Sequence, residues 1–153
     1  MEGADTNICL VVCMVPTVRL FDLAEELGVS IHWVPMRGYC RANVTWGPGN
    51  RWNIFLATGL DKNLAYFRCV LAEELGHVAT GRVFYTQDRR PQIWRCEERA
   101  FRWAATVLMP VGDVVACVVG GATVHDLCEY FVVTEPFAAR AVAWFSRWAA
   151  RAG

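Results

Sequence analysis

Between Asp61 and Val78 the apolar residues follow the spacing of an α-helix, and this segment limits the possible folds more than any other. The apolar stripe, in steps of 3 or 4 residues, consists of Leu64, Phe67, Leu71, Leu75 and Val78. Glu73 and His77 lie on the opposite side, which also carries Tyr66 and Val70. The sequence therefore predicts a helix that is covered on two faces, with polar groups inside the second contact.

Glu73 and His77 are separated by one helical turn, so both side chains lie on the same face. This is the spacing with which a His-Glu-x-x-His helix presents two ligands to zinc, and a carboxylate oxygen can replace the first histidine. Glu74 lies at the edge of such a site, where it could take a proton from metal-bound water. The pattern predicts Glu73 and His77 as metal ligands and Glu74 as the general base.

A second helix, expected from Ile93 to Met109 and ended by Pro110, offers a third ligand. Its apolar stripe consists of Ala100, Trp103, Ala104 and Val107. Glu97 falls on that stripe, and the residues expected to point away are Glu98, Arg99 and Arg102. A carboxylate on an apolar face is unfavourable to bury unless it is paired or bound to a metal. We therefore expect Glu73, His77 and Glu97 to hold one Zn²⁺ ion, with a fourth position left for water.

The segment before these helices is expected to contain a short helix and a small sheet. The helix is expected at Val18–Leu27, followed by strands at Ile31–Met36, Arg41–Trp46 and Trp52–Thr58. The residues Gly47-Pro48-Gly49-Asn50 predict a tight turn between the last two strands. The predicted fold is α+β, with a small antiparallel sheet packed on a metal-bearing helix pair. Residues from about 111 to 153 are expected to form a helical C-terminal cover.

Length and composition favour a single domain across residues 1–153. The chain is 55% hydrophobic and 20% charged, which excludes intrinsic disorder. Lys plus Arg equal Asp plus Glu at 15 each, so net charge does not indicate direct nucleic-acid binding or a membrane role. The odd number of cysteines, 7, favours reduced thiols in the cytoplasm. The apolar run Ile8–Val15 is too short to span a bilayer and is not expected to be a targeting segment.

The motifs of the two predicted helices, together with the segment that follows them, resemble the ImmA/IrrE family of metallo-endopeptidases. The residues that carry the resemblance are Ala72-Glu73-Glu74-Leu75-Gly76-His77, Glu97-Glu98-Arg99-Ala100, Trp103-Ala104, Leu108-Met109-Pro110 and the tail Val124–Thr134. That family has a His-Glu-x-x-His helix followed by a Glu-x-x-Ala helix that ends in an apolar-Met-Pro signature. The resemblance covers roughly residues 21–145, and members from mobile elements are similar in having Glu-Glu-Leu-Gly-His.

The resemblance implies a zincin-like fold with Glu73, His77 and Glu97 as metal ligands and Glu74 as the catalytic acid/base. It further implies a role in phage or mobile-element regulation, in which the protein substrate is a helix-turn-helix repressor. Two carboxylates and one imidazole would nearly neutralise a divalent ion, so a bound water would be less acidic than at a histidine-rich site. We therefore expect a slower enzyme than a relative with two histidines. Mn²⁺ could also compete with zinc at such a site.

Other interpretations of these residues remain open. Glu73 and Glu74 could form a solvated helix face, with His77 as an ordinary helix histidine. Cys69, one turn before Glu73, could be a soft metal ligand, but a buried inert thiol is the simpler interpretation. The same applies to Cys96, and His32 is expected to be ordinary. His125 could stabilise a reaction intermediate if the C-terminal segment folds back.

The C-terminal segment allows a second class of function. Its last helix carries an apolar side made of Phe137, Ala141, Trp144, Phe145 and Trp148, bordered by Arg140, Arg147 and Arg151. This side could pack in the core or bind a protein, and its aromatic content favours protein over phosphate contact. The alternative function is therefore a non-catalytic regulatory domain that binds a protein partner on a metallopeptidase-like fold. The sequence does not indicate the oligomeric state.

Overall fold

The computed structural model describes residues 15–47, 49–81 and 90–152, and most of these are helical. The elements are α1 (Thr17–Glu26), β1 (Val29–Val34), β2 (Ala42–Gly47), β3 (Arg51–Ala57), a 3-10 turn η1 (Leu60–Lys62), α2 (Leu64–Ala79), α3 (Arg90–Leu108), α4 (Val111–Val119), α5 (Val124–Phe131) and α6 (Glu135–Ala152). The predicted α+β class is confirmed. Most of the apolar run Ile8–Val15 and part of the predicted turn, Pro48, lie outside the described residues.

The three strands form one mixed sheet in the order β1-β3-β2, so the predicted antiparallel sheet is wrong. Strand β3 is antiparallel to β2 and parallel to β1. The sheet is mixed because of the path of the chain. Strand β2 forms the edge opposite β1, and β3 then returns between these two strands. The turn into β3 places Gly49 and Asn50 in the left-handed region, with φ of 82° and 55°, as a tight connection requires.

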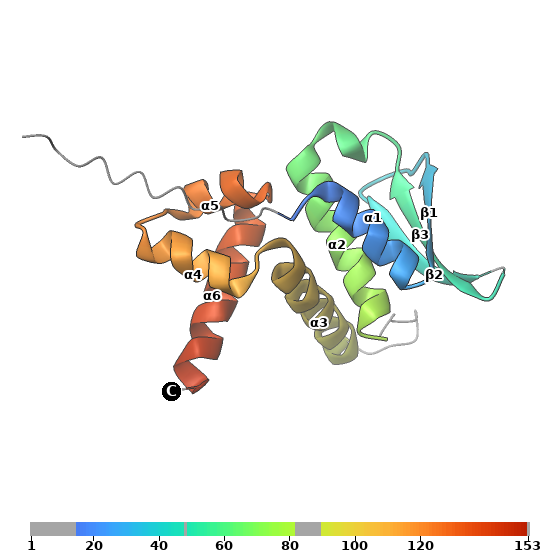
Figure 1. Cartoon of the computed structure of the whole chain (residues 1–153). Helices are drawn as coiled ribbons and strands as arrows, with labels where there is room; N and C mark the ends of the chain where they lie inside the picture. Colours follow the sequence, from blue (N-terminus) through green and yellow to red (C-terminus); the bar gives the residue numbers. More distant parts are fainter. Residues whose placement is uncertain (1–14, 48, 82–89, 153) are drawn as a thin grey trace, which may run out of the picture.

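The sheet and the first two helices share one apolar core. Ile54 and Leu56 of β3 are fully buried, and α1 and α2 pack on the sheet (Figure 1). The same cluster contains Leu20 of α1 together with Leu71 and Leu75 of α2. These alternating strand residues and helical stripes therefore fix how α2 lies against the sheet, and α2 carries most of the predicted site.

Helix α2 begins at a side-chain cap and is buried along nearly its whole length. The Oδ1 atom of Asn63 accepts a hydrogen bond from the backbone N–H of Tyr66 at 3.0 Å. The predicted stripe is buried except at Leu64, which is 49% exposed in the first turn. Gly76 faces α3 so closely that an added Cβ atom would lie 2.5 Å from the carbonyl oxygen of Ala100. A glycine at this position therefore allows the two helices to approach at the level of His77.

Arg68 is a buried charge on α2 that the sequence did not reveal. Only 1% of it is exposed, and burial lowers the pKa of its guanidinium. Its nitrogens donate to the carbonyl oxygens of Val15 (2.8 Å), Val132 (3.1 Å) and Phe131 (3.3 Å), and to Oγ1 of Thr17 (2.9 Å). One side chain therefore ties the start of α1 and the end of α5 to α2, five residues before Glu73.

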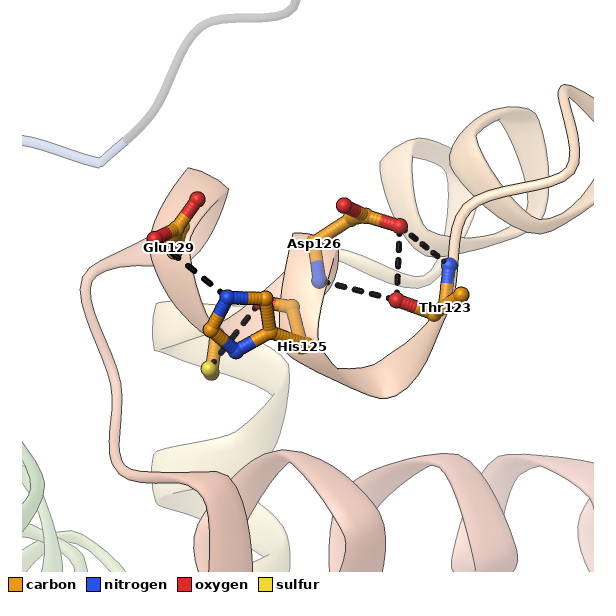
Figure 2. A network of polar contacts seen from close by, with 5 residues as sticks. Thr123, His125, Asp126 and Glu129 are labelled. Carbon is orange, nitrogen blue, oxygen red and sulfur yellow. Dashed lines mark hydrogen bonds and ion pairs between the residues drawn. The ribbon is translucent and has the colours of Figure 1, made fainter.

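The C-terminal helices lie beside α3, on the side away from the sheet (Figure 1). Helices α3 and α4 are bent by 65° at the break that contains Pro110. Helix α5 begins with a capping box, in which Thr123 and Asp126 exchange hydrogen bonds (Figure 2). In residues 15–47, 49–81 and 90–152 no single helix has the length and hydropathy to cross a membrane, and α3 with α4 meets that test only as a bent pair.

Candidate metal centre

The predicted site residues lie where α2 and α3 pack together. Glu73, Glu74 and His77 are on α2, and Glu97 is on α3. The Nε2 atom of His77 lies 3.6 Å from Oε1 of Glu97, and their side chains are 7% and 44% exposed. The structure therefore brings a buried imidazole and a half-exposed carboxylate together from two helices whose approach depends on Gly76.

Glu73 and Glu74 lie in the same electrostatic environment as this pair. Burial raises the pKa of Glu73, with a further increase from Glu97 and decreases from Arg140 and His77. The pKa of Glu74 rises to about 7, and burial of its side chain is the largest cause. Nearby His77 lowers this pKa, whereas Glu97 and Glu73 raise it. Three carboxyl groups thus influence one another near His77, and a bound cation would favour their ionised forms.

The donor types suit a divalent cation, but their positions suit it only in part. Imidazole nitrogen and carboxylate oxygen are both accepted zinc ligands. Within the described ranges, however, no three His, Cys, Asp or Glu side chains lie close enough to hold a metal ion. His77 and Glu97 are brought together, whereas Glu73 is not brought into a three-residue set with them. A site made of all three would require these side chains to lie closer together than they do here.

Glu98 is more buried than sequence reasoning expected. Its side chain is 15% exposed, against 44% for Glu97, so the expectation that Glu98 points away is wrong. Its two carboxylate oxygens accept hydrogen bonds from Arg140 Nη2 at 2.7 Å and from Arg102 Nε at 2.9 Å. These arginines hold the pKa of Glu98 below its usual value. Glu98 is shielded because α6 brings Arg140 against this side of α3.

Arg140, like Glu98, was not predicted from the sequence to lie at the site. Its guanidinium lies 3.7 Å from the ring centroid of Phe101, in addition to bonding Glu98. It is also the cation that most lowers the pKa of Glu73. The position of Arg140 beside the apolar face of the last helix was visible in the sequence, but its partners on α3 were not.

A cavity of about 300 Å³ opens directly beside Glu73. The lining residues are Tyr66, Cys69, Val70, Glu73, Phe101, Thr134, Pro136, Phe137 and Arg140. They come from α2, from α3, from the start of α6 and, for Thr134, from the link between α5 and α6. One residue of the predicted site therefore also forms part of a cavity wall.

Cys69 and Cys96 have the features of the inert-thiol interpretation. Both are buried free thiols. Burial raises the pKa of Cys69 to about 11, so the thiol stays protonated at neutral pH. Its sulfur accepts a hydrogen bond from the backbone N–H of Thr134 at 3.5 Å. In the structure as described, neither thiol belongs to a group of three metal-ligating side chains.

The two other histidines lie apart from this cluster. His125 is exposed on α5, where its Nε2 atom lies 3.5 Å from Oε1 of Glu129 (Figure 2). His32 is on β1, hydrogen-bonded to Asn53 at 2.9 Å and stacked on Phe55. Neither contributes to the shifted pKa of Glu73 or Glu74. The location of His125 gives no support to a role in stabilising an intermediate.

Compared with models of known protein families, the chain matches none, and a comparison with curated proteins gives no significant match. The resemblance to the ImmA/IrrE family therefore stays a prediction that rests on its sequence motifs. The function is inferred from the geometry of the α2–α3 cluster, which consists of Glu73, Glu74, His77 and Glu97.

Proposed function

We propose that this protein is a metal-dependent endopeptidase with its centre at the α2–α3 cluster. The observation that carries the proposal is the meeting of His77 and Glu97 from two helices, with Glu73 and Glu74 on the adjoining turn of α2. The charge arrangement supports it, because partly buried carboxyl groups lie near an imidazole, and Glu73 and Glu97 raise the pKa of Glu74. A divalent cation would relieve the repulsion among these carboxylates.

Glu73, His77 and Glu97 would hold the ion, which when bound supplies an activated water and polarises the peptide carbonyl. Zinc is the first candidate, and Mn²⁺ is the alternative because two of the three donors are carboxylates. Glu74 is buried enough for its pKa to lie near neutral pH. It would accept the proton of the attacking water and pass it to the leaving amine.

The substrate that we propose is a regulatory protein in the cytoplasm, such as a helix-turn-helix repressor. This part of the proposal rests on the resemblance of the Ala72–His77 and Glu97–Ala100 motifs to a family with that role. A protein substrate is consistent with the composition, since balanced charge does not favour direct nucleic-acid binding.

Metal content is the decisive test, measured by elemental analysis of protein purified without chelator. We expect about one zinc or manganese ion per chain, lost in His77→Ala and in Glu97→Ala. His125→Ala and Glu129→Ala are matched controls, because they remove a His–Glu pair with a similar separation of 3.5 Å on α5. A wild-type protein that takes up no metal after reconstitution would overturn the proposal.

Glu74→Gln separates chemistry from metal binding. We expect this variant to keep its metal and to lose cleavage of a peptide mixture, followed by mass spectrometry, by about 100-fold or more. Loss of metal together with activity would assign Glu74 a ligand role. Full activity in the variant would exclude it as the general base.

The alternative is a non-catalytic domain that binds a protein partner. The observation that favours it is the incomplete ligand set, because in the described part of the chain no three potential ligands converge. Exposed apolar side chains also lie on the C-terminal cover, among them Val115, Val119 and Trp148. Partner binding that is unchanged in Glu74→Gln, with no cleavage product from wild type, would favour this alternative.

A further inference from the structure

The cavity beside Glu73 has a rigid apolar back wall. Phe101 of α3 and Phe137 of α6 are 1% and 5% exposed, and their rings meet edge to face at 5.2 Å. Val70, one turn before Glu73 on α2, adds a third apolar surface. Since these side chains are fixed by core packing, the cavity is a formed feature of the fold and does not depend on an exposed loop.

The cavity opens to solvent beside two partly exposed side chains. Tyr66 is 38% exposed, and the side chain of Arg140 is 46% exposed. Its volume of about 300 Å³ is at the lower end of the range for ligand pockets. This size suits one amino-acid side chain better than a cofactor.

The charges at the cavity favour neither sign of occupant. Glu73 and Arg140 are of opposite charge, so each offsets the attraction that the other has for a charged side chain. The thiol of Cys69 is neutral and already accepts a hydrogen bond from Thr134. An uncharged apolar side chain is left as the occupant that matches both the walls and the charges.

We propose that this cavity binds a large uncharged apolar side chain of the substrate polypeptide, of the leucine, methionine or phenylalanine class, next to the bond that is cleaved. The position next to the cleaved bond rests on the proposed function, because Glu73 borders both the cavity and the candidate metal centre. The chemical preference rests on the cavity itself. The position of the cavity and its chemical preference together predict specificity for an apolar residue at one substrate position.

The first test measures binding without any need for catalysis. The full chain, as purified, is titrated with the N-acetyl amides of phenylalanine, leucine, aspartate and lysine, and the methyl resonances of Val70 and Thr134 are followed by NMR. We expect saturable shifts at about millimolar concentration for phenylalanine and leucine only, since one side chain makes few contacts. Equal shifts for all four amides, or none, would overturn the proposal.

The second test fills the cavity. In Val70→Phe we expect the affinity for the phenylalanine amide, read at Thr134, to fall by about tenfold or more. Val18→Phe is the matched control, because the same change is made at a residue that is 61% exposed on α1. Unchanged binding in a folded Val70→Phe protein would contradict the assignment, and the wild-type titration decides the matter if that variant does not fold.

The third test links the cavity to cleavage. Quenched fluorescent peptides with Ala, Leu, Phe, Asp or Lys at one varied position are offered to the zinc-loaded protein, and kcat/KM is compared. We expect preference for Leu or Phe over Ala to fall about tenfold in Val70→Phe. If Val70→Phe cleaves the peptides with the same preference as the wild type, the cavity assignment is wrong and the proposed function still stands. Selective amide binding with no peptide cleaved would overturn the proposed function and leave an apolar binding cavity.

Discussion

Helix α2 buries charge in two places, and the two places accommodate it in opposite ways. Arg68 is surrounded by carbonyl oxygens and a hydroxyl, which accept hydrogen bonds from its guanidinium. Further along the helix, burial raises the pKa of Glu73 and Glu74, and the nearby carboxylate of Glu97 raises both further. Burial disfavours the charged form at both places, but hydrogen bonds offset this cost at Arg68, whereas neighbouring carboxylates add to it at the glutamates. The difference fits a structural role for Arg68 and the role proposed above for Glu73 and Glu74.

The largest expected effect comes from removing the satisfied charge. Arg68→Met leaves the carbonyl oxygens of Val15, Phe131 and Val132 without the guanidinium donor, so we expect a loss of about 3 to 5 kcal/mol in the free energy of unfolding. Chemical denaturation measures it. Arg19→Met, at an exposed ion pair on α1, should lower the free energy of unfolding far less. Similar losses in both variants would remove the structural half of the comparison.

The next effect concerns the contact that brings the two halves of the site together. Gly76→Ala places a methyl group 2.5 Å from the carbonyl oxygen of Ala100, so we expect a loss of about 2 to 3 kcal/mol and weaker zinc binding. Gly112→Ala is the control, because nothing lies within 4 Å of its added Cβ. That variant should be about 1 kcal/mol more stable, as expected for alanine in a helix. A stabilised Gly76→Ala protein would show that the helices can separate freely.

Removing an unfavourable charge should have the opposite sign. The pKa of Glu74 in the folded chain, about 7, lies above its ordinary value of 4.5, so its ionised form weakens the metal-free fold as pH rises. We expect Glu74→Gln to stabilise the metal-free protein by about 2 kcal/mol at about pH 8, with little effect near pH 4. Thermal unfolding at both pH values checks this. A variant less stable than wild type at the higher pH would contradict the comparison.

The smallest effect is expected at Arg140, the cation that most lowers the pKa of Glu73. Arg140→Gln removes the hydrogen bond to Glu98 and the contact with the ring of Phe101, at a cost of about 1 kcal/mol because the arginine is half exposed. A double-mutant cycle with Glu98→Gln measures the pairing itself, and Arg147→Gln on the same helix is the control. A coupling free energy near zero would mean that Arg140 acts on Glu73 and Phe101 without help from Glu98.

The helical part of the fold could be predicted because its signals are local. The stripe from Phe67 to Val78 and the stop at Pro110 are each set by residues within a few turns. The pairing of β1 could not be predicted, since alternating apolar residues do not indicate whether a neighbouring strand is parallel. The sheet is mixed because β3 enters between β1 and β2, which is a property of the whole chain path.

Of the candidate site, the approach of His77 to Glu97 is the part that follows from the sequence. The helical spacing on α2 and the apolar stripe that contains Glu97 predicted that these two side chains would meet, and they lie 3.6 Å apart. The relative exposure of Glu97 and Glu98 could not be predicted, because it depends on Arg140, which lies 42 residues after Glu98 in the chain. Burial of Arg68 was equally hidden, since its partners lie 51 to 64 residues away.

Those long sequence separations have a consequence for the order of folding. When α2 leaves the ribosome, two of the carbonyl groups that Arg68 will bind, at Phe131 and Val132, have not yet been synthesised. Until they arrive, the guanidinium keeps water around it, and this end of α2 cannot close against its neighbours. Contacts of such high contact order slow folding. We therefore expect a nascent chain that ends before α5 to remain sensitive to proteases at the α1–α2 junction, although its sheet is complete.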